Sequence, residues 1–250
     1  ELAQKQVICR LHSYEAFAGF VAQIKWERID DLIFVADHIK EQVLLQQPDL
    51  EQKVKRIHIL PNGINLDRFA FTERTKGHNL AFVGDINYKK GPLLLFHAFA
   101  ELVRRDPRYT LSVAGRFQDD RFALYFSQMT KEMGFEKNLR FDGWVDDISG
   151  WLDDKQYIVS SSLLEGHPVG LMEGMARGLK PVIHNFVGAR GIYDDRFVWN
   201  TIDEFVAMVT SDDYDSAAYR AFVEDNFSLT RQLEQLKEIF GRIEKEINDR

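Results

Sequence analysis

The chain has 250 residues, and 45% of them are hydrophobic, which is enough for the packed core of one large domain or one and a half ordinary ones. A formal net charge of −7 argues against a general nucleic-acid-binding protein, although a local basic pocket for a small anion is compatible with it. The single cysteine, Cys9, excludes an intramolecular disulfide and suits a reducing cytoplasm, and no apolar run reaches the roughly 20 residues of a membrane span.

The first block of the chain predicts a partial α/β domain. Strands are predicted at 7–11, 31–36 and 56–60, helical spacing at 17–24, and a helix at 38–45. Three strands are too few for a complete doubly wound domain, so we expect a fragment of a larger protein or residues missing before Glu1. The turn-rich run 61–69 and the polar stretch 72–78 place the end of this domain at residue 70.

From residue 79 strands and helices alternate, which predicts a Rossmann-like, doubly wound parallel sheet with helices on both faces. The predicted strands are 80–84, 109–115, 138–143, 157–162 and 181–184; the predicted helices are 91–105, 121–133, 148–152, a short one ending at Gly178, then 203–211, 216–224 and 229–247. This gives a second domain at 71–226 and a closing helix at 227–250. Ligands bind at the carboxyl ends of parallel strands, where Gly84, Gly115 and Gly143 fall.

Two glutamates, Glu165 and Glu173, bracket a turn containing glycine and proline that opens the short helix. We expect Glu173 in the first turn of this helix. Helix N-termini carry unpaired N–H groups and about half a positive charge, so the amides of Val169, Gly170 and Leu171 suit phosphate oxygens. Carboxylates beside them could accept hydrogen bonds from sugar hydroxyls. Taken alone, the pair is equally consistent with a helix-dipole acid and a solvated loop acid.

Three motifs in register point to one family. They are Asn-Gly-Ile-Asn-Leu-Asp-Arg-Phe at 62–69, Phe-Val-Gly-Asp-Ile-Asn-Tyr-Lys-Lys-Gly at 82–91, and the run 162–173 with its Gly-Leu-Lys-Pro-Val continuation at 178–182. In this order they resemble the C-terminal half of the retaining glycosyltransferases of family 4, which have the GT-B fold.

The resemblance implies a two-domain enzyme of the hexosyltransferase type. Its active site would lie in a cleft between two Rossmann-like domains, and the C-terminal domain would hold a nucleotide-diphosphate sugar. By position in the motifs, Lys90 would bind the phosphates, Glu173 the ribose hydroxyls, and Glu165 the transferred sugar. His12 resembles the N-domain histidine that faces the donor sugar, although a strand-end histidine can also serve the local backbone.

Further donor contacts follow from the same resemblance. The loop at Gly84 would let the backbone approach the diphosphate, and the amides of Val169 to Leu171 would bind phosphate or sugar. The base would be recognised around Arg116 and Gly143, and His167 lies in the donor-binding turn. Trp144 and Tyr88 could stack on a base or simply pack at loops. His97, His167 and His184 show no spacing that recommends a metal site.

One departure from the family pattern concerns the phosphate loop. The family has arginine directly after the glycine, and here that position is Asp85. A carboxylate beside a diphosphate is repulsive, by a few kcal/mol if poorly screened. Either Lys89 or Arg116 supplies the missing charge, or Asp85 turns away to bind something else, or donor binding is lost. We favour compensation by Lys89 or Arg116.

The implied mechanism is retention without an obligatory metal or other cofactor, in which the acceptor hydroxyl attacks on the face that the diphosphate leaves. The expected acceptor is a saccharide, a lipid-linked molecule or a small molecule, and nucleic acid is not an expected partner. We expect a cytoplasmic protein and leave open peripheral contact with the inner membrane face. The competing classes are a non-catalytic GT-B-like nucleotide-sugar-binding module and a nucleotide-sugar epimerase or phosphorylase of the same plan.

Overall fold

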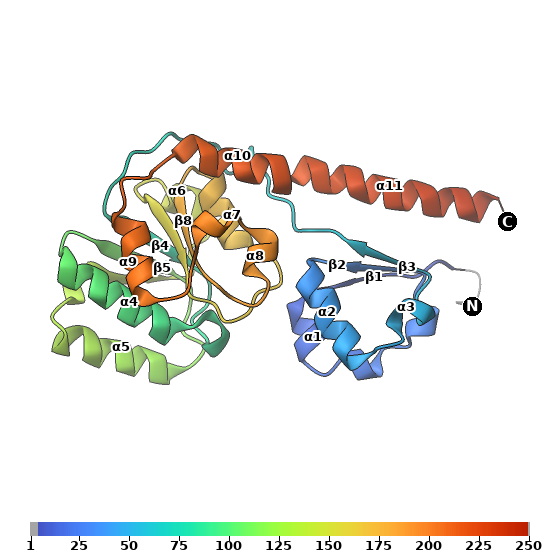
Figure 1. Ribbon diagram of the computed structural model, residues 1–250, viewed down its shortest axis with the longest axis horizontal. Helices are drawn as coiled ribbons and strands as arrows, with labels where there is room; N and C mark the ends of the chain where they lie inside the picture. The colour runs from blue at the N-terminus through green and yellow to red at the C-terminus, as the bar shows by residue number, and fades with distance from the viewer. Residues whose placement is uncertain (1–4, 250) are drawn as a thin grey trace. The chain divides into compact units, whose positions relative to one another are not determined.

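The computed structural model describes residues 5–249, which form two compact units (Figure 1). The first unit holds the chain up to Gly63, the short segment Glu165–His167, and the chain from Phe227 onward. The second holds Ile64–Leu164 and Pro168–Asn226. The chain therefore leaves the first unit at Gly63, where we expected residue 70, and the closing helix belongs to this unit instead of standing apart. Residues 1–4 and 250 of the predicted domains lie outside the described residues.

The first unit is built on a three-stranded parallel sheet of order β1-β2-β3. Its elements are β1 (Ile8–Leu11), α1 (Ser13–Phe17), β2 (Asp31–Phe34), α2 (Asp37–Gln46), α3 (Leu50–Lys53), β3 (Arg56–Ile59) and α11 (Leu229–Asn248). The helical spacing predicted over 17–24 yields only the end of α1, because Gly19 takes a φ of 77° and two short 3-10 turns follow.

Helix α11 supplies the hydrophobic cover of this small sheet. Ile239 and Ile243 of the helix join Ile33 and Leu60 in one buried cluster, with Leu236 packed against it. Buried Asp31 of β2 accepts a hydrogen bond from Arg242 at 3.0 Å and pairs with Arg56 at 2.7 Å. The amphipathic helix thus buries its apolar stripe on the strands of the first unit.

The second unit is a six-stranded, all-parallel sheet of order β6-β5-β4-β7-β8-β9 with helices around it (Figure 1). The strands are β4 (Asn79–Val83), β5 (Thr110–Ala114), β6 (Leu139–Gly143), β7 (Tyr157–Ser160), β8 (Lys180–His184) and β9 (Val198–Trp199). The helices are α4 (Pro92–Arg105), α5 (Asp120–Glu132), α6 (Ile148–Trp151), α7 (Val169–Ala176), α8 (Ala189–Ile192), α9 (Ile202–Thr210) and α10 (Ser216–Phe227). The α/β, Rossmann-like prediction is confirmed. The short α8 and β9 carry too little periodicity to be predicted.

The strand order has a functional consequence. Chain order runs outward from β4 to β5 and β6 on one side, and from β7 to β8 and β9 on the other, so the direction of winding reverses between β4 and β7. Loops leaving neighbouring strands on either side of such a reversal diverge above and below the sheet. The carboxyl ends of β4 and β7 are therefore where a ligand is expected.

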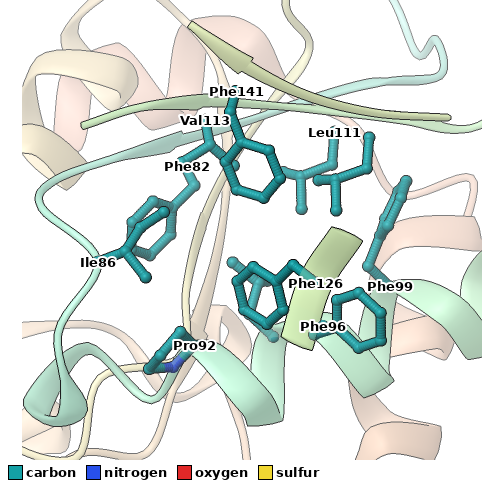
Figure 2. A pocket seen from close by; sticks show the side chains of 11 residues that line it. Phe82, Ile86, Pro92, Phe96, Phe99, Leu111, Val113, Phe126 and Phe141 are labelled. Atoms are coloured by element: carbon teal, nitrogen blue, oxygen red, sulfur yellow. The ribbon is translucent and has the colours of Figure 1, made fainter. Parts of the chain in front are cut away.

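An aromatic core supports the end of β4. Figure 2 shows Phe82, Val113 and Phe141 from the strands facing Phe96 and Phe126 from the helices, and the last two rings stack with centroids 4.9 Å apart. These side chains surround a cavity of about 20 Å³ with an almost wholly apolar lining. Such a cavity suits neither phosphate nor sugar, so its role is packing.

Candidate functional site

Three glycines lie side by side at the carboxyl ends of β4, β5 and β6. Gly84 donates its N–H to the carbonyl of Ala114 at 2.9 Å, and Gly115 donates to that of Gly143 at 2.7 Å. A methyl group on Gly115 would sit 1.9 Å from the carbonyl oxygen of Gly84. Gly84 and Gly143 take φ values of 144° and 68°. The backbone here is closely packed, and the small glycines leave it uncovered by side chains, as an approach of phosphate to main chain requires.

The loop from Gly84 to Gly91 is held in a fixed shape. The side chain of Asn87 accepts a hydrogen bond from the N–H of Lys90, and Gly91 follows in the left-handed region at a φ of 58°. A methyl group on Gly91 would lie 2.1 Å from the carbonyl oxygen of Ser161. The hydroxyl of Ser161, just beyond β7, donates to the carbonyl of Lys90 at 2.7 Å. The loop after β4 is thereby tied to the loop after β7.

The side chain of Lys90 folds back over the start of its own loop. A methyl group on Gly84 would meet Cε of Lys90 at 3.3 Å and its Nζ at 3.5 Å. The first turn of α7 reaches the same strand end, since a methyl group on Gly170 would meet Cβ of Val83 at 3.1 Å. The N–H groups of the first helical residues, Val169 to Leu171, have no intrahelical acceptor. An ammonium group and a helix N-terminus thus converge on the end of β4, which makes an anion seat.

Asp85 is bonded to the loop that follows β5. Its carboxylate accepts from the backbone N–H of Arg116 at 2.9 Å and from Nε2 of Gln118 at 3.2 Å. Gln118 also accepts from Nδ2 of Asn87 at 3.0 Å. Of the three alternatives raised by the sequence, the geometry corresponds to the second, in which the acid binds something else. Asp85 joins the two loops that frame the glycines.

Arg116 and Lys89, the two residues expected to compensate for Asp85, make different contacts. The guanidinium of Arg116 lies 5.2 Å from the ring centroid of Trp144, just past Gly143, so its charge is engaged with an exposed aromatic face. The carbonyl of Lys89 accepts from the N–H of Leu163 at 2.8 Å, a second tie to the loop after β7. Arg116 and Trp144 therefore lie beside each other, next to Gly143.

Glu173 lies in the second turn of α7, because the helix begins at Val169 and its first turn contains no acid. The expectation of a first-turn acid was therefore wrong. Its side chain is half-buried, and this burial raises the pKa of its carboxyl, against a smaller lowering by Arg68. A half-buried acid one turn beyond the anion seat is placed for hydroxyl recognition better than for the helix dipole.

Glu165 and His167 belong to the first unit, and Glu173 belongs to the second. The carbonyl of Glu165 accepts from Nε2 of His38 at 2.7 Å. Nδ1 of His167 accepts from the N–H of Asn62 at 3.3 Å, and burial, with smaller contributions from the charges of His38 and Arg10, lowers the pKa of His167 to about 3. His167 is thus a neutral, buried ring and provides no charge for a phosphate.

His12, also in the first unit, is exposed at the end of β1, where it precedes α1. Its backbone N–H donates to a carboxylate oxygen of Glu15 at 2.9 Å. Partial burial and the nearby charge of Arg10 lower the pKa of its imidazole, so the ring is neutral near pH 7. A neutral imidazole at the carboxyl edge of the sheet can contact a sugar hydroxyl.

Three residues that shape the site were missing from the predicted set: Ser161, Asn87 and Gln118. Gly115 was expected at a ligand-side strand end, but its close approach to Gly84 was not. The three missing residues act through contacts within and between loops, which local sequence patterns do not encode.

Within residues 5–249, no three His, Cys, Asp or Glu side chains are grouped so that they could hold a metal ion. None of the helices in that range combines the length and the hydropathy that crossing a bilayer needs.

Comparison with known proteins gives a consistent result. The profile of the family described as Glycosyl transferases group 1 matches residues 64–237. The chain is 24% identical over 275 aligned residues to the UDP-Gal:alpha-D-GlcNAc-diphosphoundecaprenol alpha-1,3-galactosyltransferase of Escherichia coli, covering 94% of this chain and 69% of that protein. It is 25% identical over 134 residues to the GDP-mannose:cellobiosyl-diphosphopolyprenol alpha-mannosyltransferase of Xanthomonas oryzae, covering 51% of this chain but only 34% of that one.

A solved structure shares the architecture. The crystal structure of Anabaena HepE in complex with UDP superposes with a TM-score of 0.81 at 15% sequence identity, over 96% of this chain and 73% of that one. At this identity the likeness establishes the fold, which is that of the GT-B glycosyltransferases.

Proposed function

The chain belongs to the family of glycosyl transferases group 1, and from this we propose that it transfers a hexose from a nucleotide-diphosphate sugar to an acceptor hydroxyl with retention of anomeric configuration. The family match covers the whole of the second unit and extends into α11.

One observation carries the proposal. At the point where the winding of the sheet reverses, Lys90 and the N-terminus of α7 converge on the end of β4. A diphosphate bound there would accept hydrogen bonds from the ammonium group of Lys90 and from several backbone N–H groups, and none of these donors would have to move. Preorganised donors of this kind stabilise the charge that develops on a leaving group, which is the main requirement of the reaction.

The proposed chemistry uses the diphosphate itself. The bond between the anomeric carbon and the phosphate oxygen breaks, while the acceptor oxygen forms a new bond on the same face of the sugar. The acceptor proton passes to a phosphate oxygen, so no separate protein base is needed. Lys90 and the amides of Val169 to Leu171 stabilise the departing diphosphate, Glu173 binds the ribose hydroxyls, and Glu165 and His12 contact the transferred sugar.

The relatives support a uridine or guanosine diphosphate sugar as donor. The Escherichia coli relative uses UDP-galactose, the Xanthomonas relative uses GDP-mannose, and both are named for α-linked products. Since both donors carry α-linked sugars, α-products correspond to retention. Both relatives act on diphosphopolyprenol-linked acceptors, so the proposed acceptors include lipid-linked saccharides. For the same reason the proposal includes a cytoplasmic location with peripheral contact with the membrane. No metal or other cofactor is part of the proposed chemistry.

A donor panel tests the proposal. Calorimetric titration with UDP, GDP, UDP-galactose, UDP-glucose and GDP-mannose should identify one base that binds. Incubation with the matching sugar nucleotide should then release nucleoside diphosphate, and the first-formed sugar product should be the α-anomer in proton NMR. Binding without release would indicate a non-catalytic module, interconversion of intact sugar nucleotides would indicate an epimerase, and a β-anomer would contradict retention.

A further inference from the structure

We propose that His38 and Asn62 are positioning residues that hold the backbone of Glu165, the acid that contacts the transferred sugar in the proposed function. The inference rests on the proposed function, because it explains how Glu165, one of the proposed donor contacts, is held in position.

The segment Glu165–His167 is separated in sequence from the rest of its unit, yet it is bound there at both ends. At its start, Nε2 of buried His38 donates to the carbonyl of Glu165 at 2.7 Å, over 127 residues of sequence. At its end, Nδ2 of Asn62 donates to the carbonyl of His167 at 3.0 Å, and the N–H of Asn62 donates to the imidazole of His167. Glu165 is thus fixed on a backbone anchored on both sides.

The anchor at Asn62 is itself oriented. The guanidinium of Arg10 donates to Oδ1 of Asn62 at 3.0 Å and to the carbonyl of Leu60 at 3.2 Å. An amide whose oxygen faces Arg10 must present its NH₂ group elsewhere, and it presents that group to His167. Arg10 of β1 therefore fixes the orientation of the Asn62 side chain, and Asn62 in turn holds the segment Glu165–His167 in place.

The middle of the segment is pressed against the same unit. A methyl group on Gly166 would lie 3.3 Å from the backbone nitrogen of Ser13, 3.3 Å from Cγ2 of Val35, and 3.4 Å from Cβ of Ser13. Ser13 lies two residues beyond β1 and Val35 directly follows β2, so the segment lies on the carboxyl edge of the first sheet. Glu165 as a whole residue is 6% exposed, so it is not a loop acid lying free in solvent.

This geometry gives the positioning residues a distinctive signature. Loosening Glu165 should reduce use of the intact sugar nucleotide while leaving binding of the bare nucleoside diphosphate unchanged, since that contact belongs to Lys90, α7 and Glu173. A loss of general structural integrity would weaken both. The two ligands therefore separate positioning from folding.

The test compares His38→Ala, His38→Gln and Asn62→Asp with wild-type protein in the full chain. Gln retains a donor at a similar reach, whereas Asp keeps the acceptor for Arg10 but has no donor for His167. With UDP and UDP-galactose, or GDP and GDP-mannose if guanosine is the base, we expect His38→Ala and Asn62→Asp to lose about tenfold or more in kcat/KM. Affinity for the nucleoside diphosphate should stay within about twofold, and His38→Gln should recover much of the loss.

Matched variants fix the scale of the comparison. Glu165→Gln should show the same separation of the two ligands, and Glu41→Ala, an exposed change on α2, should show none. Equal weakening of both ligands in His38→Ala, or unchanged kcat/KM in both positioning variants, would overturn the inference. Wild-type protein that binds none of the nucleotides would instead contradict the proposed function, and the inference with it.

Discussion

The ammonium group of Lys90 lies at the start of its own loop, beside Gly84, at the strand end that the first turn of α7 also reaches. If it stabilises the departing diphosphate, Lys90→Ala should reduce kcat by about 100-fold or more, the range typical for loss of one preorganised charge donor. Lys90→Arg should retain part of the rate. The change should be measured in initial rates of transfer, with the thermal midpoint recorded to show that the fold is intact.

The matched control for Lys90 is Lys131→Ala, an exposed lysine near the end of α5. It should transfer at the wild-type rate, because its charge is remote from the end of β4. Wild-type turnover in Lys90→Ala would remove this residue from the mechanism.

Glu173 makes a prediction about pH. Burial raises the pKa of its carboxyl, so protonation begins at a higher pH than for an exposed glutamate. A carboxylate that accepts from ribose hydroxyls loses acceptor capacity on protonation, and UDP or GDP affinity should therefore fall as the pH is lowered through this raised pKa. Calorimetry from neutral to mildly acidic pH would measure it.

In Glu173→Gln that pH dependence should disappear. The sign for stability is opposite: a raised pKa means that ionisation of Glu173 costs stability once the pH exceeds the unfolded value. The Gln variant should therefore bind the nucleotide more weakly while unfolding at a slightly higher temperature at pH 7. Unaltered pH dependence in the variant would assign the effect to another group.

Asp85 shows how far residue identity alone can reach. The sequence reveals an acid where the family has arginine, and electrostatics predicts a problem for a diphosphate. The partners of Asp85 are 31 and 33 residues away, on a loop whose approach depends on the pairing of β4 with β5. Its role could therefore be questioned from the sequence but not determined.

At the scale of elements, the loops that follow β4 and β5 pack tightly where Gly115 faces the carbonyl oxygen of Gly84. A Cβ 1.9 Å from that oxygen forces the backbone to move, so Gly115→Ala should destabilise the protein by about 2 kcal/mol or more and weaken UDP or GDP binding. Chemical denaturation and calorimetry would measure the two effects. Gly241→Ala, in α11 with no atom within 4 Å of the added methyl, should be neutral or stabilising by up to about 1 kcal/mol. Equal effects of the two changes would contradict the tight packing at Gly115.

The attachment of α11 to the first sheet gives a second prediction at this scale. Burial opposes ionisation of Asp31, but hydrogen bonds from Arg56 and His58 outweigh it and lower its pKa to about 2. Asp31→Asn should reduce the free energy of unfolding by about 2 kcal/mol, less than for a wholly buried pair because water screens Arg242, which is 41% exposed. Urea denaturation would measure the loss.

The acid dependence of this contact has a definite sign. Because its folded pKa is depressed, Asp31 contributes stability above its unfolded pKa, and this contribution is lost as the pH falls toward about 2. Asp31→Asn should flatten that decline. In the same unit, Glu51→Gln breaks a more exposed ion pair with Lys40 and should change stability by less than about 0.5 kcal/mol. An Asp31→Asn protein as stable as wild type at neutral pH would contradict this account of α11.

At the scale of the whole molecule, the alternation of strands and helices from residue 79 was enough to predict the second unit, because each βα pair has its own periodicity. The membership of the first unit was not predictable. The apolar stripe of α11 shows that one face of the helix is buried. That this face packs on β2 and β3 depends on Asp31 and Arg56, which are far away in sequence. Likewise, no local pattern indicates that Glu165–His167 joins the first unit while Glu173 stays with the second.

The central claim is that the end of β4, Lys90 and the first turn of α7 form the seat of the donor diphosphate. A crystal structure of the protein with UDP or GDP bound tests it most directly. We predict the diphosphate within hydrogen-bonding distance of Nζ of Lys90 and of the N–H groups of Val169 to Leu171. The ribose hydroxyls should bind Glu173, and Asp85 should remain hydrogen-bonded to the loop after β5. A nucleotide bound elsewhere, or one whose phosphates contact neither Lys90 nor α7, would contradict the claim.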